Sequence, residues 1–487
     1  MEKDSSRNGG GRFGEIVKEE LEIVFFEEVV LFFSVIKWVF LATVVGILVG
    51  IATTIFLKTL DISISLHANF SYYYLLLPVA ILLSKVMIKY LAPEAEGHGT
   101  EKVIEAIHRR SGKIDVKVIP VKLVATVITL AAGGSVGKEG PAAQIGAGIS
   151  SLFADLLRFS DTDRKKIVVC GISAGFASIF GTPISGALFG MEVLFLGSVM
   201  YEVILPSFVS GIVAYQTART FGISYEYFPM SFFVPSITHF LTYSVLAGIF
   251  FGIVAVIFIE ILKLTETFFK NLRWRDSYKA LLGGVLLVLL ALVFSDDYLG
   301  LGLDKIHDTL VVGEAHPYDF LLKAIFTSIT LASGGSGGIV TPLFFVGSTS
   351  GVLFANLLHL NARIFAALGF VGVLAGAANT PISASIMAIE IFGPKMGPYA
   401  AIVSVISFLI TGHRSVYPSQ RIGIRKSPSV EVEIGAEVED VRPIVRPSGV
   451  PPVMGLYGKV RLLLRRLIGV RRRYPFRKRG RKRGRRP

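Results

Sequence analysis

The residue best placed to do chemistry in this sequence is Glu139, a single carboxylate within the glycine-dense run GGSVGKEGPAAQIGAG at residues 133–148. Glycine lets backbone N–H groups approach a ligand closely, and Pro141 suits the first turn of a helix. A helix start carries unsatisfied N–H groups and a partial positive charge, so it can bind an anion. Because an ionised carboxylate is itself an anion, Glu139 either competes with a free ion there or merely stabilises the helix start.

The glycine run occurs twice. Residues 334–347, GGSGGIVTPLFFVG, match residues 133–146 at a constant offset of 201, with Val340 at the position of Glu139. A second block, residues 181–192 (GTPISGALFGME), matches residues 379–390 (NTPISASIMAIE) at an offset of 198. The chain therefore consists of two related halves. In hydrophobic proteins, repeated glycine-interrupted segments point to a transport site at the interface of the halves.

Two further breaks resemble helix starts. The sequence GHGT at residues 97–100 precedes a helical run at 101–109, and SVYPSQ at 415–420 places Tyr417 directly before Pro418. With the two glycine turns these make four expected helix N-termini. If they converge, their partial charges replace an anion's hydration and still let the ion leave.

The composition is that of a polytopic membrane protein, with 52% hydrophobic residues and a mean hydropathy of +0.62. Runs at 35–57, 72–90 and 240–261 approach or exceed the roughly 20 residues needed to cross hydrocarbon. Broken helices at membrane depth require surrounding protein or a water-filled cavity, which predicts a compact bundle with an internal pathway. The single cysteine, Cys170, excludes an intrachain disulfide and a multi-cysteine metal site, and no metal is expected.

We divide the chain into four parts. Residues 1–33 are a polar start and an amphipathic interfacial helix, 34–229 the first transmembrane half, and 230–420 the second. Within the second half, residues 296–317 are polar enough to be a solvent-facing loop. Residues 421–487 form a proline- and charge-rich, basic tail with one short strand at 430–434. No signal peptide is expected.

The positive charge lies in the tail. Residues 459–486 contain fifteen Lys and Arg and no acid. Because the whole chain has a net charge of +14, the remaining residues sum to −1. The positive-inside rule places such a tail in the cytoplasm, where it would attract anionic lipid. Nucleic acid is not expected as a partner, because no folded or aromatic-interleaved module accompanies the tail.

Together these motifs resemble the CLC family of chloride channels and chloride/proton antiporters, over residues 34–421. GKEGP at 137–141 is similar to the family's G(K/R)EGP, GIVTP at 338–342 to its GxFxP, GHGT at 97–100 to its GSGIP, and Tyr417 to its central tyrosine. The resemblance implies an all-α polytopic homodimer of two inverted-repeat halves with one pore per subunit. It also implies no cofactor, no enzymatic activity, and a cell-membrane location of the prokaryotic type that lacks paired C-terminal nucleotide-binding modules.

The resemblance also implies roles for single residues. Glu139 would be the gating glutamate, which enters the anion site when ionised and leaves when protonated. Tyr417 would offer its hydroxyl to chloride, although an interfacial aromatic is the alternative. The other residues expected to bind the anion, chiefly through their backbone, are His98, Gly99, Gly137, Lys138, Gly140, Ile339 and Val340.

Departures from the family pattern bear on the mechanism. His98 stands at the position of a serine and either donates to the anion or faces a vestibule and caps its own helix; Glu101 replaces the family's proline. Val193 occupies the place where proton exchangers often carry a second glutamate, and an apolar side chain cannot carry a proton. Glu192 has a counterpart in Glu390, and is either an inner acid or a helix cap.

The sequence therefore predicts transport of chloride or another small monovalent anion, gated by protonation of Glu139. A channel of the voltage-gated type is favoured by Val193, and a chloride/proton antiporter is the alternative. A remote alternative is an integral-membrane enzyme that holds a phosphorylated ligand at its glycine turns. It lacks a P-loop, because Lys138 is followed by Glu139 and not by Ser or Thr.

Overall fold

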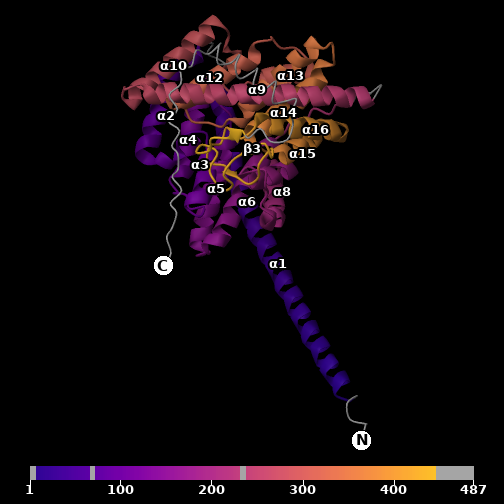
Figure 1. Ribbon diagram of the computed structural model, residues 1–487. Coiled ribbons are helices and arrows are strands. Elements are labelled where there is room, and N and C mark those ends of the chain that lie inside the picture. Colours follow the sequence, from indigo (N-terminus) through magenta and orange to yellow (C-terminus); the bar gives the residue numbers. More distant parts are fainter. Residues whose placement is uncertain (1–6, 66–71, 231–236, 446–487) are drawn as a thin grey trace, which may run out of the picture. The chain divides into compact units, whose positions relative to one another are not determined.

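The computed structural model describes residues 7–65, 72–230 and 237–445, with side chains described for residues 24–65, 72–230 and 238–444. Helices account for most of it (Figure 1). Those of the first half are α1 (Arg7–Ser65), α2 (Leu77–Leu91), α3 (Thr100–Arg109), α4 (Val118–Ala131), α5 (Glu139–Leu156), α6 (Asp161–Phe180), α7 (Pro183–Glu192) and α8 (Ile204–Thr220).

The second half repeats this order. Its helices are α9 (Ile237–Asn271), α10 (Asp276–Val293), α11 (Leu303–Val311), α12 (Asp319–Ser333), α13 (Val340–Leu357), α14 (Ala362–Ala378), α15 (Pro381–Phe392) and α16 (Gly397–Thr411). The repeats found in the sequence fall on α5 with α13 and on α7 with α15. The helix before α7 is α6, and the helix before α15 is α14. Each is followed by a C-cap residue in the left-handed conformation, Gly181 after α6 and Asn379 after α14.

Six helical segments of the described chain are long and apolar enough to cross a membrane: Val24–Ser65, Tyr73–Leu91, Thr238–Asn271, Asp276–Val293, Val340–Leu357 and Pro394–Thr411. They include the runs expected from the sequence. The described chain also contains shorter apolar helices, such as Val118–Ala131 and Ala362–Ala378. Helix α1 continues without a break through residue 33, where the sequence suggested the end of an interfacial segment.

Glycine allows the central helices to touch backbone to backbone. A Cβ added at Gly146 of α5 would lie 2.4 Å from the carbonyl oxygen of Gly171 in α6. In the second half a Cβ at Gly347 of α13 would lie 2.2 Å from the carbonyl oxygen of Gly369 in α14. Small residues at such contacts are how helices approach closely in membranes. The repeat therefore conserves a packing contact as well as a turn.

The two halves are joined by reciprocal contacts in antiparallel register. Gly137 and Gly338 form an antiparallel bridge, in which each backbone N–H donates to the other's carbonyl, at 2.7 and 2.6 Å. Gly137 and Gly338 are equivalent positions of the two repeats. Their reciprocal hydrogen bonds are those expected when the two copies are related by a two-fold axis.

Four hydroxyl groups, two on either side of the bridge, form equivalent contacts between the halves. The Ser135 hydroxyl lies 3.1 Å from that of Thr327, and the Ser336 hydroxyl lies 3.0 Å from that of Thr126. Each contact joins a glycine turn of one half to a helix of the other, α12 or α4. The fold is thus an all-α membrane protein built from two inverted-repeat halves. The sequence offsets predicted the repeat, and the family resemblance implied its inversion.

Two segments differ from the sequence-based expectation. Residues 296–317 are not simply a solvent-facing loop, because they contain α11 and bury Tyr298, Leu299 and Ile306. Helix α11 is the second-half counterpart of α3: the turn Gly300–Leu301–Gly302 precedes it as Gly97–His98–Gly99 precedes α3.

The second difference lies after Thr411, where the described residues contain no helix. Pro418 opens a turn closed by the Gln420 N–H donating to the Tyr417 carbonyl at 3.1 Å. The expected fourth helix N-terminus at Tyr417 is therefore wrong. The short strand β2 (Arg421–Ile422) follows instead and pairs in parallel with β1 (Phe195–Leu196).

The end of the described chain divides into two units. Residues 433–441 belong to the same compact unit as the helices, so this part of the tail packs on the membrane body. Among the described residues, 427–432 and 442–445 form a separate unit, where β3 (Val430–Glu431) pairs antiparallel with β4 (Ile444–Val445). The short strand expected at 430–434 corresponds to β3, while the basic run at 459–486 lies outside the described residues.

Candidate functional site

The carboxylate of Glu139 lies at the start of a helix of the other half. Its residue is only 1% exposed, in the first turn of α5. One carboxylate oxygen, Oε1, accepts the backbone N–H of Val340, and the other, Oε2, accepts the hydroxyl of Thr341 at 2.8 Å. Both donors belong to the first turn of α13. The carboxylate thus lies at the N-terminus of a helix of the opposite repeat, a kind of position that favours negative charge.

Two glycines enclose this carboxylate. A Cβ at Gly137 would lie 2.3 Å from Oε2 of Glu139, and a Cβ at Gly338 would lie 2.3 Å from Oε1. Real Cβ contacts do not come this close, so any side chain at either position would displace the carboxylate. The Gly137–Gly338 bridge therefore holds the two turns together and leaves room for an acid, or an anion, beneath them.

A third helix start packs against the same point. Gly97 and Gly99 both have positive φ, 77° and 81°, which turns the chain sharply before α3. A Cβ at Gly140 would lie 2.0 Å from the carbonyl oxygen of His98, and one at Gly99 would lie 2.4 Å from the carbonyl oxygen of Gly140. The N-termini of α3, α5 and α13 therefore meet around Glu139, three of the four starts expected from the sequence.

His98 and Tyr417 lie on one side of this meeting point. Their ring centroids are 5.6 Å apart, and the residues are 6% and 0% exposed. Nδ1 of His98 is buried without a hydrogen-bond partner, and the hydroxyl of Tyr417 faces Thr100 without a hydrogen bond of ordinary geometry. Each residue therefore has a polar atom that is free to contact a ligand.

Of the other predicted anion-binding residues, Lys138 and Ile339 are the N-cap residues of α5 and α13, and Lys138 is partly buried. Ile339 is 1% exposed. Val193 lies in the apolar core at 0% exposure, directly after α7, and its carbonyl accepts a hydrogen bond of 2.8 Å from Gln420. No titratable side chain is available at that position itself.

Glu192 and Glu390 cap each other's repeat. Glu192 accepts the N–H groups of Ile382 and Ser383, at 3.0 and 2.8 Å, in the first turn of α15. Glu390 accepts the N–H groups of Ile184 and Ser185, at 2.9 and 2.8 Å, in the first turn of α7. Both oxygens of each carboxylate are satisfied by a helix start, which agrees with the helix-capping interpretation of the two acids.

Two residues that support the site were missed from the sequence. Thr341 donates to Glu139, and its signal was its place in GIVTP opposite Gly140 in the repeat. Lys122 is completely buried and its ammonium donates to the carbonyls of Ala95, at 3.1 Å, and Gly97, at 2.6 Å, which fixes the turn before α3.

Lys323 plays the same part in the second half. Its buried ammonium donates to the carbonyls of Tyr298, at 3.1 Å, and Gly300, at 2.9 Å, before α11. The signal for both lysines was a lone charge inside an apolar helical run, repeated at the offset of 201. Each ammonium is held by carbonyls and not by an acid, so it fixes a turn without neutralising the site.

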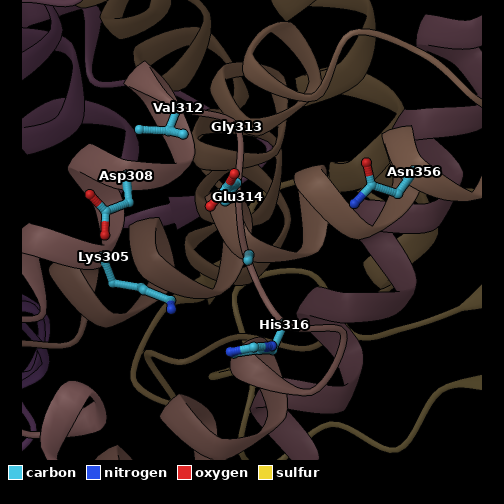
Figure 2. A pocket seen from close by; sticks show the side chains of 8 residues that line it. Lys305, Asp308, Val312, Gly313, Glu314, His316 and Asn356 are labelled. Atoms are coloured by element: carbon cyan, nitrogen blue, oxygen red, sulfur yellow. The ribbon is translucent and has the colours of Figure 1, made fainter.

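A cavity of about 450 Å³ leads to the His98 side of the site, and His98, Glu101 and Pro418 are among its lining residues. A separate cavity of about 600 Å³ lies around the end of α11, lined by Lys305, Asp308, Val312, Gly313, Glu314, Ala315, His316 and Asn356 (Figure 2). The second cavity contains none of the predicted site residues. Within the described part of the chain no three His, Cys, Asp or Glu side chains cluster in a way that could hold a metal.

Comparisons with known proteins agree with this geometry. The family model described as voltage gated chloride channel matches residues 79–412. The chain is 36% identical over 397 residues to a protein of Pseudomonas syringae pv. tomato named chloride/fluoride channel protein, covering 80% of this chain and 87% of that one.

Solved structures show the same fold. The crystal structure of a CLC-type fluoride/proton antiporter is similar at a TM-score of 0.76 and 30% identity, covering 80% of this chain and 99% of that chain. The structure of a slow cyanobacterial Cl⁻/H⁺ antiporter is similar at a TM-score of 0.68 and 20% identity, covering 77% and 94%. At that identity the second likeness concerns the fold alone.

Members of this family are anion channels and transporters, not enzymes; they use no cofactor, and their dimeric assembly is typical. The matched region takes in α3, α5 and α13, whose starts surround Glu139, and ends just before Tyr417. The chain is a multi-pass membrane anion-transport protein that belongs to the CLC family of voltage gated chloride channels.

Proposed function

We propose that this chain transports small monovalent anions, chloride and fluoride among them, through the position of the Glu139 carboxylate, and that protonation of Glu139 opens the path. The observation that carries the proposal is the pair of donors on that carboxylate, the Val340 N–H and the Thr341 hydroxyl. An anion can use the same donors only after the carboxylate has left. In the described part of the chain no Lys or Arg side chain forms an ion pair with this carboxylate, which suits an ion that must also leave.

Protonation gives the carboxylate a reason to leave. A neutral carboxylic acid gains little from a helix N-terminus, because the partial positive charge there favours the ionised form. The proton therefore weakens the competitor and the anion takes its place. His98 and Tyr417, with a free ring nitrogen and hydroxyl, would then coordinate the anion from the cavity side.

Fluoride joins chloride in the proposal because two relatives at 30% identity or more are named for it, a chloride/fluoride channel protein and a fluoride/proton antiporter. A compact hydroxyl donor such as Thr341 suits a small, strongly hydrated anion as well as a larger one. We place the activity in the cell membrane of the source organism.

Between the two modes of transport we favour passive conduction. Val193 is buried among apolar side chains and carries no proton. Exchange of the anion for a proton is the second candidate. It is favoured because a single acid, Glu139, would both compete with the anion and take up the proton.

Anion efflux from liposomes that hold the purified protein would test the proposal, with the membrane potential set by potassium and valinomycin and the external pH recorded. We expect efflux that rises with acidity in the wild type and loses its pH dependence in Glu139→Ala. Glu314→Gln, a change of the same charge at the separate cavity, is the matched control. Proton movement against its gradient would establish the exchanger, and absence of anion flux in every form would refute transport.

The basic tail enters the proposal as a membrane contact. Its charge of +15 between residues 459 and 486 favours a cytoplasmic C-terminus and attraction to anionic lipid. Vesicle binding by a peptide of residues 459–487 should require anionic lipid and weaken with salt. Anion efflux should survive removal of the residues after 441.

A further inference from the structure

Three buried polar atoms without a hydrogen-bond partner gather at the start of α3. They are Nδ1 of His98, Oε2 of Glu101 and the hydroxyl of Tyr417. His98 and Glu101 line the cavity of about 450 Å³, together with Pro418, which adjoins Tyr417. A buried polar atom without a partner is destabilising, so such atoms mark places where a ligand, a water or a proton completes the structure.

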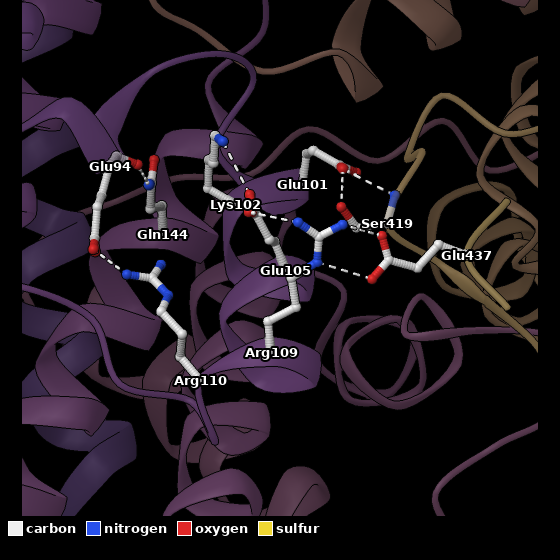
Figure 3. A network of polar contacts seen from close by, with 9 residues as sticks. All are labelled: Glu94, Glu101, Lys102, Glu105, Arg109, Arg110, Gln144, Ser419 and Glu437. Carbon is white, nitrogen blue, oxygen red and sulfur yellow. Dashed lines mark hydrogen bonds and ion pairs between the residues drawn. The ribbon is translucent and has the colours of Figure 1, made fainter. Parts of the chain in front are cut away.

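Glu101 is the unusual member of this group, because it is an acid. Its Oε1 accepts both the backbone N–H of Ser419, at 2.9 Å, and the hydroxyl of the same residue, while Oε2 accepts nothing (Figure 3). The carboxylate is therefore anchored through one oxygen. The other oxygen is free to take up a proton without breaking an existing bond.

The other charged groups around the cavity occur in pairs. Lys85 pairs with Glu96, Lys270 with Glu266, Lys102 with Glu105, and Asp276 with Lys89, while Lys279 also lines the wall. Arg109, two turns further along α3, contacts Glu105 and Glu437 (Figure 3). Among the described acids that line this cavity, Glu101 is the one without a cation partner, so a proton is the simplest way to neutralise it.

Glu101 is linked to the Glu139 turn through Tyr417 and His98. Ser419, whose N–H donates to Glu101, lies two residues after Tyr417, and the His98 ring packs against that of Tyr417. His98 adjoins the Glu139 turn directly, through the contact of its carbonyl with Gly140. The residues that carry the three unpartnered atoms therefore join the cavity wall to the turn that carries Glu139.

We propose that Glu101 is a proton-accepting residue that takes protons from this cavity and supplies them to Glu139, in place of the acid that is absent at Val193. The inference rests on the proposed function of Glu139. A proton from water in the cavity binds Oε2 of Glu101. It then passes along the polar atoms of His98 and Tyr417 to Glu139, which leaves Glu101 ionised again. The net change is the protonation of Glu139 from the cavity side.

The contact with Ser419 allows a competing explanation, in which Glu101 merely holds the Tyr417 turn against α3. The two roles can be separated. Glu101→Gln keeps an Oε1 that accepts from Ser419 and removes the proton acceptor. Ser419→Ala removes the hydroxyl donor and leaves the carboxylate. Glu105→Gln makes the same charge change one turn along the same helix and serves as the control.

The test is the liposome assay with all variants measured over a range of pH, recording anion efflux and proton uptake. We expect Glu101→Gln to retain anion efflux at its most favourable pH and to lose most of its pH dependence. Any proton uptake coupled to efflux should fall by about 100-fold, the low end for loss of a positioned proton-transfer group. Ser419→Ala and Glu105→Gln should resemble the wild type, and Glu101→Asp should restore part of the response.

Two results would overturn the inference. If Glu101→Gln keeps the wild-type pH dependence and proton uptake, Glu101 takes no part in proton supply. If Ser419→Ala reproduces the defect of Glu101→Gln, the residue acts by holding the turn. Glu139→Ala, measured beside them, separates this failure from that of the proposed function: an unchanged pH response there refutes gating by Glu139, and the role of Glu101 with it.

Discussion

The starts of α5 and α13 are built on the same sequence pattern, but only one of them carries an acid. Gly137 and Gly338 exchange backbone hydrogen bonds as equals, and the pairs of Ser135 and Ser336 with threonines of the opposite half are reciprocal. The equivalence ends two residues later, where Glu139 of the first repeat corresponds to Val340 of the second. The comparison teaches that the repeated residues build the frame and that the residues that differ between the repeats supply the chemistry.

The same division holds around α3 and α11. Lys122 and Lys323 fix both preceding turns through backbone carbonyls. The turn before α3, however, contains His98, where that before α11 contains Leu301. A polar ring that faces the cavity is therefore present in one half and replaced by an apolar side chain in the other.

Exchange of the asymmetric pair should have the largest effect. The double variant Glu139→Val with Val340→Glu moves the carboxylate to α13, where it meets Gly140 and not a threonine hydroxyl. We expect the rate of anion efflux to lose its pH dependence and to fall by at least about 100-fold, equivalent to roughly 2.7 kcal/mol. Recovery of a wild-type pH response would show that the halves are functionally interchangeable.

The contact between α3 and α5 should be the next most sensitive. Gly140→Ala places a Cβ 2.0 Å from the carbonyl of His98 and should lower the free energy of unfolding by about 2 kcal/mol. The mirror change in the other half, Thr341→Gly, creates no clash and removes one hydrogen bond, for about 1 kcal/mol. Thermal unfolding in detergent measures both. Equal effects would mean that the two turns are packed alike.

The two capping acids should behave as equals. Glu192→Gln and Glu390→Gln each replace a carboxylate that accepts two N–H groups of a helix start, so each should lower the free energy of unfolding by about 1 kcal/mol. Neither should alter the pH dependence of anion efflux. An effect on that dependence from Glu192→Gln alone would assign Glu192 a part in proton transfer and break the symmetry.

The smallest effect concerns the tether of α3 to the C-terminal segment. The Arg109 guanidinium lowers the pKa of Glu437, whose side chain is 12% exposed in the pair. Because the folded pKa is depressed, the stabilisation is complete above the ordinary glutamate value of about 4.3 and is lost as the pH falls through the folded pKa.

Glu437→Gln should therefore lower the free energy of unfolding at pH 7 by about 0.5 kcal/mol, as expected for a pair with one exposed partner. The difference from the wild type should vanish in acid. Thermal unfolding at both pH values measures it, and a difference that persists below the folded pKa would exclude the ion pair as its cause.

Much of the architecture could be predicted from the sequence. The offsets of 201 and 198 located the halves, and GKEGP and GIVTP located two of the helix starts that meet at Glu139. Hydrophobic runs and glycine turns are local patterns, so they predict helices and breaks directly. The expected helix after Pro418 failed because the chain there satisfies its backbone through a turn and through Glu101, a residue 318 positions earlier.

Sequence by itself determined that the chain is a duplicated membrane protein and that the one acid at its glycine turns differs between the copies. Only the tertiary structure decided which groups meet that acid. Glu139 accepts from Val340 and Thr341, 201 and 202 residues away, and Glu101 reaches Ser419 across the same interface. Glycine turns have no side chains that specify a partner. Their hydrogen bonds are fixed when the two halves pack, because buried donors and acceptors must then find each other.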